Sequence, residues 1–260
     1  DTSDGHATLY SGGDIEVAST TRETASTVVV GLALANTFSG AGSVDFLTLN
    51  NTNKASISEV DVHADGNLSV LATDIVDYTP GIGNVAISGT AAGGGSFLVM
   101  LNNNETEASM SGVVSNAKGV TLVHGWSVAD IDAVAVVVGG GVKGSFMGSF
   151  SFYVSGTTTR GIIEGGSRAA EVNRDSSYDH AQQSVIVQAT DDVTTSQVTG
   201  AASASIFGAL GGALSYTEIE NTVDAHIGSF ARVSAQKDVI VSAESSKDIT
   251  GASGGLGVAL

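Results

Sequence analysis

Cysteine is absent from this chain of 260 residues, and that absence excludes both a disulfide framework and a zinc site built on thiolates. Proline occurs only once, and aromatic residues make up 5% of the sequence. The longest apolar run, residues 133–141, has about half of the roughly 18 residues that a membrane-spanning helix needs. We therefore expect no membrane span in this chain.

Basic residues are also scarce, because 10 Lys and Arg stand against 27 Asp and Glu, for a formal net charge of −17. Nucleic acids and anionic membranes are bound by basic surfaces, so we expect neither as a partner. A negative surface keeps a protein soluble and attracts cations. Acidic pairs such as Asp130 with Asp132 are compatible with weak surface Ca²⁺ binding, although the calcium-binding nonapeptide repeat is missing.

Residues that favour helices are few, and stretches with apolar residues at positions i, i+3 and i+4 are rare. Glycine, by contrast, fills 34 positions, and Val, Ala, Ser and Thr supply most of the remainder. Small and β-branched side chains suit closely packed pleated strands. The composition indicates an all-β fold.

A repeat of about 53 residues organises the sequence, because residues 66–118 match residues 13–65 without a gap. Three landmarks extend the alignment: a strand start at Ile15, Leu68, Val120, Val185 and Val239; a glycine at Gly42, Gly95, Gly148 and Gly212; and a small residue at Ala55, Ala108, Gly161 and Ala225. The copies are residues 13–65, 66–118, 119–183, 184–237 and a truncated 238–260. Such a period indicates a solenoid, so we interpret residues 1–260 as one repetitive segment of a longer chain.

Within one copy, alternation of apolar and polar residues predicts strands at residues 13–18, 28–35, 43–49 and 55–64. We expect a polar turn at residues 20–27 and a glycine turn before the third strand. The apolar parity switches within residues 55–64, which predicts a corner or bulge there.

The two halves of a copy resemble each other weakly at an offset of 29 residues, which predicts two coils of about 24 and 29 residues per repeat. About ten coils, stacked at the strand spacing of about 4.8 Å, make a parallel β-helix on the order of 45–50 Å long. Parallel crossovers favour right-handed winding. A tandem of small antiparallel sandwiches is the alternative, but a single repeat is too short for one to bury a core alone.

Two kinds of ladder are expected between successive copies. The third strand carries most of the aromatic residues, which we expect to stack from copy to copy. Asparagine recurs at one turn, at Asn51, Asn104 and Asn221, with Thr157 in the remaining copy. Because asparagine tolerates turn conformations and forms hydrogen-bonded ladders, we interpret this row as structural.

One irregularity lies between Ile163 and Val185, where the third copy holds about eleven extra residues. A solenoid accepts insertions only at its corners, so we expect residues 164–183 to leave the rod as a surface loop, and deletion of residues 169–178 to leave folding intact. We also expect this loop to contact a neighbouring copy, a receptor or a glycan. The candidate contact residues are Arg168, Glu171, Arg174, Asp175, Tyr178, Asp179 and His180.

Catalytic motifs are weak. Ser176, Ser177, Asp179 and His180 are residue types of a hydrolase triad, but a triad is assembled from separate parts of a fold. The five histidines have no paired ligand spacing, and the glycine-rich residues 139–145 lack the Gly-Lys-Ser order of a phosphate loop. We expect no enzymatic activity, no catalytic or metal-binding residue and no cofactor beyond weak surface calcium.

The stretches Asn221-Thr-Val-Asp-Ala-His-Ile-Gly228, Ala231-Arg-Val-Ser-Ala-Gln-Lys-Asp-Val-Ile-Val-Ser-Ala243 and Gly254-Gly-Leu-Gly-Val-Ala-Leu260 resemble repeats of large bacterial surface exoproteins. These include filamentous haemagglutinin-like proteins, leukotoxin-type filamentous adhesins and autotransporter passenger regions. The resemblance covers nearly the whole chain. It implies a parallel β-helix, export to the cell surface and a role in adhesion or extracellular fibres, with no catalytic residues to transfer.

The expected function is therefore that of a structural or adhesive extracellular rod, a segment of a large secreted adhesin that assembles into a filament or binds a cell-surface receptor or glycan. The alternative is a polysaccharide-cleaving β-helix of the lyase or tail-spike type. That chemistry needs paired carboxylates or a basic residue in an aromatic-lined groove. The sequence has one tryptophan, Trp126, and no aromatic cluster outside the third strand of the repeat.

Overall fold

The computed structural model describes residues 6–260, which form strands almost throughout. The strands are β1 (Ala7–Ser11), β2 (Ile15–Ala35), β3 (Phe38–Leu49), β4 (Thr52–Ser58), β5 (Val60–Ala64), β6 (Leu68–Ser88), β7 (Ala91–Asn102), β8 (Glu105–Ser111), β9 (Val114–Ala117), β10 (Val120–Gly141), β11 (Gly144–Ser155), β12 (Thr158–Glu164), β13 (Ala170–Val172), β14 (Ser184–Ser205), β15 (Ala209–Ile219), β16 (Thr222–Ile227), β17 (Ala231–Val233) and β18 (Val239–Ala259). A short 3-10 helix, η1 (Ser176–Tyr178), precedes β14.

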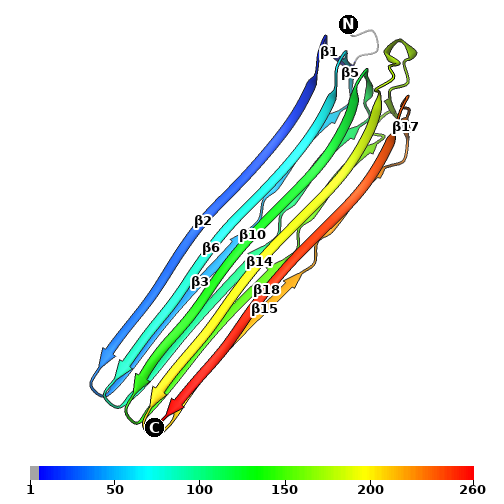
Figure 1. The fold of residues 1–260 in the computed structure, drawn as a ribbon. Coiled ribbons are helices and arrows are strands. Elements are labelled where there is room, and N and C mark those ends of the chain that lie inside the picture. The colour runs from blue at the N-terminus through cyan, green and yellow to red at the C-terminus, as the bar shows by residue number, and fades with distance from the viewer. Residues whose placement is uncertain (1–5) are drawn as a thin grey trace.

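Four parallel sheets build a solenoid, as the sequence predicts (Figure 1). Sheet A has the order β1-β5-β9-β13-β17, sheet B β18-β14-β10-β6-β2, sheet C β15-β11-β7-β3 and sheet D β16-β12-β8-β4. In Figure 1 the long strands of sheet B descend in front, the strands of sheet C ascend behind them, and successive coils advance to the right. The winding is therefore right-handed.

Each repeat forms one coil, so the prediction of two coils per repeat is wrong. Ile15 pairs with Leu68 and Phe38 pairs with Ala91, each at a spacing of one whole repeat. A coil as long as a whole repeat closes because it is flat: the 21-residue strand of sheet B lies against the 12- and 7-residue strands of sheets C and D. Five stacked coils span only about 19 Å, whereas the long strands extend about 70 Å, so the long dimension lies along the strands.

The hydrogen-bonded register confirms two of the three landmarks. Gly42, Gly95, Gly148 and Gly212 form one row, and Ala55, Ala108, Gly161 and Ala225 form another. The remaining landmark, the strand start, is shifted by one position in the third copy. There Thr121, not Val120, pairs with both Leu68 and Val185.

Two predicted turns are strand instead. Residues 20–27 lie within β2, where Thr20 to Thr27 pair continuously with β6. Their polar side chains alternate between the two faces of a strand in the terminal coil, and threonine is itself a good strand former. The glycine row runs through the middle of sheet C rather than through a turn.

The predicted corner is confirmed between β4 and β5. Glu59 adopts a φ of 54° there, and Gly112 at the equivalent position has a φ of 60°. Left-handed backbone turns the chain sharply, which glycine tolerates and a glutamate accepts only with strain. In the fourth copy the positive φ falls at Phe230.

The interior divides into three apolar clusters. The largest lies between sheets A, B and D, the second between sheets B and C, and the smallest near the ends of the sheet B strands. Their buried residues include Leu68, Val70, Met110 and Ile163 in the first, Tyr78, Leu98, Met100 and Ile131 in the second, and Ala86, Val137 and Met147 in the third.

A buried polar layer separates the first two clusters and contains the asparagine row. Asn104 Nδ2 donates to Asp74 at 2.8 Å, and Asn221 Nδ2 donates to Asp191 at 2.5 Å. Asn51 N donates to Asn104 Oδ1 at 2.9 Å, which links two coils, so the structural interpretation of this row is confirmed. Burial raises the pKa of Asp74 and Asp191, and the asparagine hydrogen bonds oppose that rise.

Candidate functional site

The insertion in the third coil has two parts. Residues paired between adjacent coils differ in residue number by one repeat length. For Glu164 and Ser111 this difference equals that of the other copies, but it is larger for Val172 and Ser115 and larger again for Ser184 and Val120. Four residues are therefore added before β13 and seven after it, which agrees with the predicted eleven. β13 itself stays in sheet A, so the expectation that all of residues 164–183 leave the rod is wrong.

This placement also corrects the expected tolerance to deletion. Ala170 and Val172 are fully buried in the first apolar cluster, and Asn173 Oδ1 accepts a hydrogen bond from Ala117 N. Deleting residues 169–178 would remove β13 and open the core. The exposed segment is residues 174–182, in which only Tyr178 is half-buried.

The first added segment is fixed to the corner at Glu59. Ser167 donates to the Glu59 carboxylate from N and Oγ, at 2.7 and 2.6 Å, and these bonds lower the pKa of Glu59. Arg168 donates from Nε to Gly112 O at 2.6 Å and forms an ion pair with Asp61. Arg168 therefore ties three coils together and is half-buried, rather than free for a partner.

The second added segment is a short, ordered loop. Asp175 caps η1 by accepting from Ser177 N and Oγ at 2.9 and 2.8 Å, and these bonds lower the pKa of Asp175. Asp175 N donates to Asn116 Oδ1 at 3.0 Å. Buried Gln183 closes the loop by donating from Nε2 to Ala117 O at 2.8 Å and to Tyr178 O at 3.3 Å.

Tyr178 lies at the centre of a cluster on the outer face of sheet A. Its ring stacks on His63 with the centroids 5.4 Å apart, and Lys118 Nζ lies 5.8 Å from its centroid. Lys118 forms a 2.6 Å ion pair with Asp65, which also accepts from Tyr10 at 3.0 Å. The ion pair raises the pKa of Lys118 and lowers that of Asp65. We name these five residues the tyrosine cluster.

The candidate residues thus separate into different environments. Only Tyr178 joins the tyrosine cluster, while Glu171 lies in β13 and pairs with Arg232 at 3.3 Å. Arg174, Asp175, Asp179 and His180 are exposed on the loop, and Asp175 is occupied as the cap. His180 Nδ1 accepts from Gln182 N at 3.3 Å, and Ser177 Oγ donates to Asp175.

Sequence reasoning missed the other members of the tyrosine cluster. A signal for them exists, since Tyr10 and His63 are one repeat apart, as are Asp65 and Lys118. Projecting the repeat onto one coil would have placed these residues in two adjacent rows. The proximity of Tyr178 to them follows from the fold of the loop, for which the repeat contains no template.

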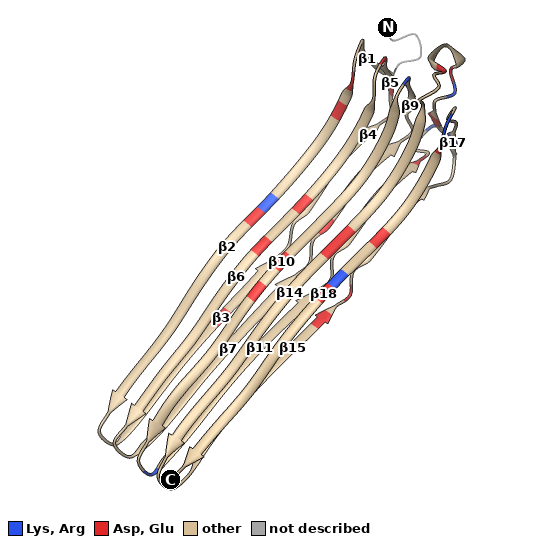
Figure 2. Ribbon diagram, in the orientation of Figure 1, with Lys and Arg blue, Asp and Glu red and all other residues tan. Residues whose placement is uncertain are grey.

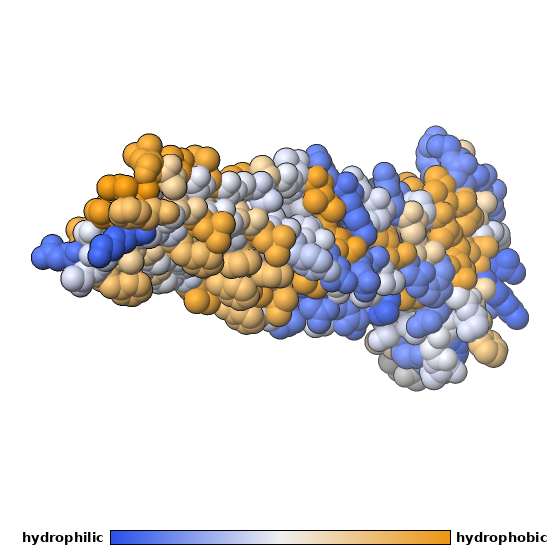
Figure 3. All heavy atoms as spheres, turned by 90° about the horizontal axis from the view of Figure 1, so that it is seen from below, coloured by the Kyte–Doolittle hydropathy of each residue, from blue (hydrophilic) through white to orange (hydrophobic). Residues whose placement is uncertain are grey.

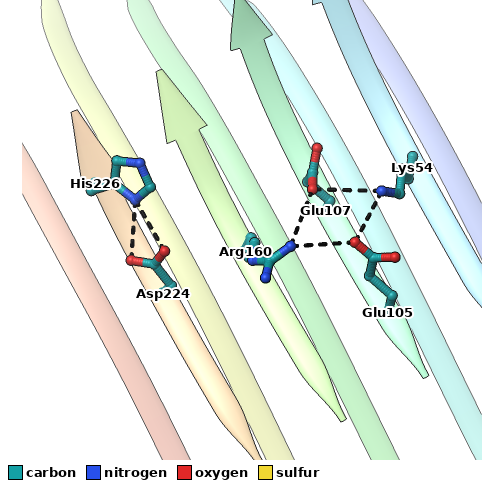
Figure 4. A network of polar contacts seen from close by, with 6 residues as sticks. All are labelled: Lys54, Glu105, Glu107, Arg160, Asp224 and His226. Carbon is teal, nitrogen blue, oxygen red and sulfur yellow. Dashed lines mark hydrogen bonds and ion pairs between the residues drawn. The ribbon is translucent and has the colours of Figure 1, made fainter. Parts of the chain in front are cut away.

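A second polar feature crosses the outer face of sheet D (Figure 4). Lys54, Glu107, Arg160 and Asp224 form one cross-strand row of alternating charge. Lys54 and Arg160 both bind Glu105, at 2.9 and 3.3 Å, and both reach Glu107 at 3.7 Å. We name this row and Glu105 the charge ladder. Its members are partly exposed, so each pair contributes at most about 1 kcal/mol, but together they favour this coil register.

A polar cleft of about 450 Å³ adjoins the charge ladder. Its lining consists of amide, hydroxyl and charged side chains: Asn50, Asn51, Thr52, Asn103, Asn104, Glu105, Thr158 and Arg160. These groups offer many hydrogen-bond donors and acceptors with no aromatic platform.

Asp130 and Asp132, the acidic pair considered for calcium, lie on the outer face of sheet B next to Asp77. Asp74 and Asp191, in contrast, are buried. Burial and the two neighbouring carboxylates raise the pKa of Asp130. Among residues 6–260, no group of three or more His, Asp or Glu is arranged to hold a metal ion.

The fold defines the chain as a parallel β-solenoid with a flat, two-layered cross-section. No protein-family model, curated protein or solved structure matches it. Within the described part of the chain, no helix has the length and apolar character needed to cross a membrane.

Proposed function

We propose that this chain is a structural and adhesive rod outside a bacterial cell, a segment of a large secreted surface adhesin or fibre, and not an enzyme. The observation that carries the proposal is that the polar groups join coil to coil. The charge ladder, the asparagine row and the tyrosine cluster each connect side chains from successive coils. Such contacts reinforce a stack of repeats, which is the mechanical task of a solenoid.

The resemblance to filamentous haemagglutinin-like and autotransporter repeats supports an extracellular location. The high negative charge and the absence of cysteine are consistent with it. In this function, residues 174–182 and the tyrosine cluster contact a receptor, a glycan or a neighbouring chain. Exposed Arg174, Asp179 and His180 supply polar contacts beside the Tyr178 ring.

Surface labelling of the cells that produce the protein tests this proposal. An antibody raised against the folded chain should label intact cells, and extracellular protease should remove the signal. Labelling only after permeabilisation would contradict an extracellular role. Incubation with acidic and neutral polysaccharides should release no new reducing or unsaturated ends, and release of such ends would favour the polysaccharide-cleaving alternative.

A further inference from the structure

The half of the solenoid farthest from sheet A has almost no charge (Figure 2). We name as the distal half residues 28–47, 81–100, 134–153, 198–217 and 252–260, which together number 89. Only two of the 37 charged residues of the chain, Asp45 and Lys143, fall in it. Asp45 points inward, where it accepts from Thr27 Oγ1 at 2.5 Å, and Lys143 lies in the turn between β10 and β11. The outer faces of the distal half therefore carry no charge.

The distal half has large apolar side chains on its outside as well as in its interior. Small and polar residues, including buried Ser96, Ser149 and Asn84, share the interior with Leu98 and Met147. Other large apolar residues point outward, and Figure 3 shows apolar residues gathered at the end of the molecule that lies at the left. The outward residues of sheet C that are more than two-fifths exposed are Phe38, Val44, Phe46, Phe97, Phe146, Phe150, Leu210, Leu214 and Tyr216.

The outer face of sheet C is uneven as well as apolar. Val44, Phe97, Phe150 and Leu214 form one row across the four strands, and Phe46, Val99, Phe152 and Tyr216 form the next. Aromatic contacts with centroids 5.5–6.4 Å apart join these rows into one ridge, which confirms the predicted stacking. The ridge faces outward rather than into the core.

Beside this ridge lies the glycine row Gly42, Gly95, Gly148 and Gly212, a strip of the outer face without side chains, which we name the glycine groove. A Cβ at Gly42 or Gly95 would meet only ordinary contacts at 3.8 Å, and one at Gly212 would meet nothing within 4 Å. At Gly148 a Cβ would lie 3.4 Å from the Phe150 ring, so the ridge partly covers the strip on β11. On β3, β7 and β15 the fold does not require glycine, and packing within this chain leaves that space unused.

We propose that the outer face of sheet C binds a second copy of this chain, face to face, with the aromatic ridge of each copy in the glycine groove of the other. Successive outward rows are about 6.6 Å apart along a strand, so a two-fold arrangement shifted by one row aligns each ridge with a groove. This inference concerns assembly and does not depend on the proposed adhesive function.

The size of the face suits a specific dimer. Four strands at about 4.8 Å and ten residues at about 3.3 Å give a face of about 19 by 33 Å. Pairing two such faces buries on the order of 1,200 Å², which is at the lower end of the range for specific interfaces. Phenylalanine and tyrosine, which lie at its centre, are both enriched at protein interfaces, and tyrosine is among the residues that contribute most binding energy there.

Charge favours a second copy at this face. The chain carries a net charge of −17, so two copies approach most easily through faces without charge. The same negative charge disfavours an anionic lipid bilayer.

Sedimentation velocity on the full chain tests the proposal. The wild-type chain should form a dimer at micromolar concentration, and the double variant Phe97→Asp/Phe150→Asp should be a monomer. The matched control, Val30→Asp/Leu32→Asp, places the same charges at exposed apolar positions of the outer face of sheet B and should remain a dimer. A monomeric wild-type chain at 100 micromolar would overturn the proposal, as would a control that dissociates while the sheet C variant does not.

A groove-filling variant separates shape recognition from general apolar attraction. Gly95→Leu adds an apolar side chain at a position with ordinary space, so the fold and the hydrophobicity of the face are retained. It should weaken dimerisation at least tenfold, and unchanged affinity would refute the ridge-in-groove arrangement. Flotation with phosphatidylcholine vesicles is the last measurement. Binding of a monomeric wild-type chain to vesicles, lost in the Phe97→Asp/Phe150→Asp variant, would identify lipid as the occupant and overturn the proposal.

Discussion

Replacing Gly161 with alanine should destabilise the protein, although the other copies of the repeat have alanine at the equivalent position. The equivalent residues in the other copies are Ala55, Ala108 and Ala225, and removing a strand glycine ordinarily stabilises by about 0.5–1 kcal/mol. In the third coil, however, sheets B and D approach each other closely. A Cβ on Gly161 would lie 2.1 Å from Gln188 O and 3.2 Å from Val123 O.

The collision at Gly161 involves backbone, which cannot rotate away. Gly125 of the same coil shows the reciprocal approach, since its Cβ would lie 2.2 Å from Arg160 O. Relief requires the two sheets to separate by about 1 Å, and overpacking of that kind costs about 1–3 kcal/mol. For a domain of this size the cost corresponds to a fall in Tm of about 2–12 °C.

Thermal and urea unfolding followed by circular dichroism measure this effect. Gly200→Ala is the control, because its Cβ would meet only an ordinary contact with Val136 at 3.9 Å and should stabilise by about 0.4–1 kcal/mol. The two variants should therefore shift the free energy of unfolding in opposite directions. A Gly161→Ala variant as stable as the Gly200→Ala variant would refute the close approach of the sheets.

Three further predictions concern the polar layer and the loop. Asp74→Asn should raise the free energy of unfolding at pH 7 by about 1 kcal/mol, because burial raises the pKa of Asp74 and asparagine keeps the acceptor for Asn104. The wild-type chain should lose that stability as the pH rises from the ordinary aspartate pKa through the raised one, and urea titrations in which the two proteins show parallel pH profiles would contradict this. Tyr178→Ala should abolish hydrogen-exchange protection in residues 174–182 with little change in Tm, and retained protection would show that the stack on His63 does not order the loop. Deleting residues 175–181 should leave cooperative unfolding intact, because the spacing from Val172 to Ser184 then equals that from Ser115 to Val120; loss of folding would place the loop in the core.

The repeat register could be predicted from the sequence because hydrogen-bonded partners one repeat apart have similar side chains. The number of coils could not. Residues 13–17 and 42–46 resemble each other because both contain strand residues with similar alternation, yet they lie in different sheets of one coil. Sequence similarity within a copy therefore reflects shared secondary structure, whereas similarity between copies reflects the stacking of one coil on the next.

The outward direction of the aromatic ridge could not be predicted for a related reason. In β7, Phe97 and Leu98 are adjacent and both apolar, so alternation does not tell which one faces the core. Leu98 is fully buried and Phe97 is 42% exposed, although both side chains are large and apolar. The alternation of side chains along a strand identifies the buried face only where the other face is polar.

The tyrosine cluster illustrates how a repetitive surface acquires one distinctive position. Tyr10 precedes the first coil, His63 and Asp65 belong to the first, Lys118 to the second, and Tyr178 to the insertion in the third. A row of identical repeats presents the same contacts at every coil, so a partner could slide from one to the next. Because η1 folds back over the two preceding coils, its ring covers His63 and Lys118 at one level of the stack only. A partner that recognises this cluster is therefore held at a single height along the rod, while the uncharged face of sheet C remains open to a second copy.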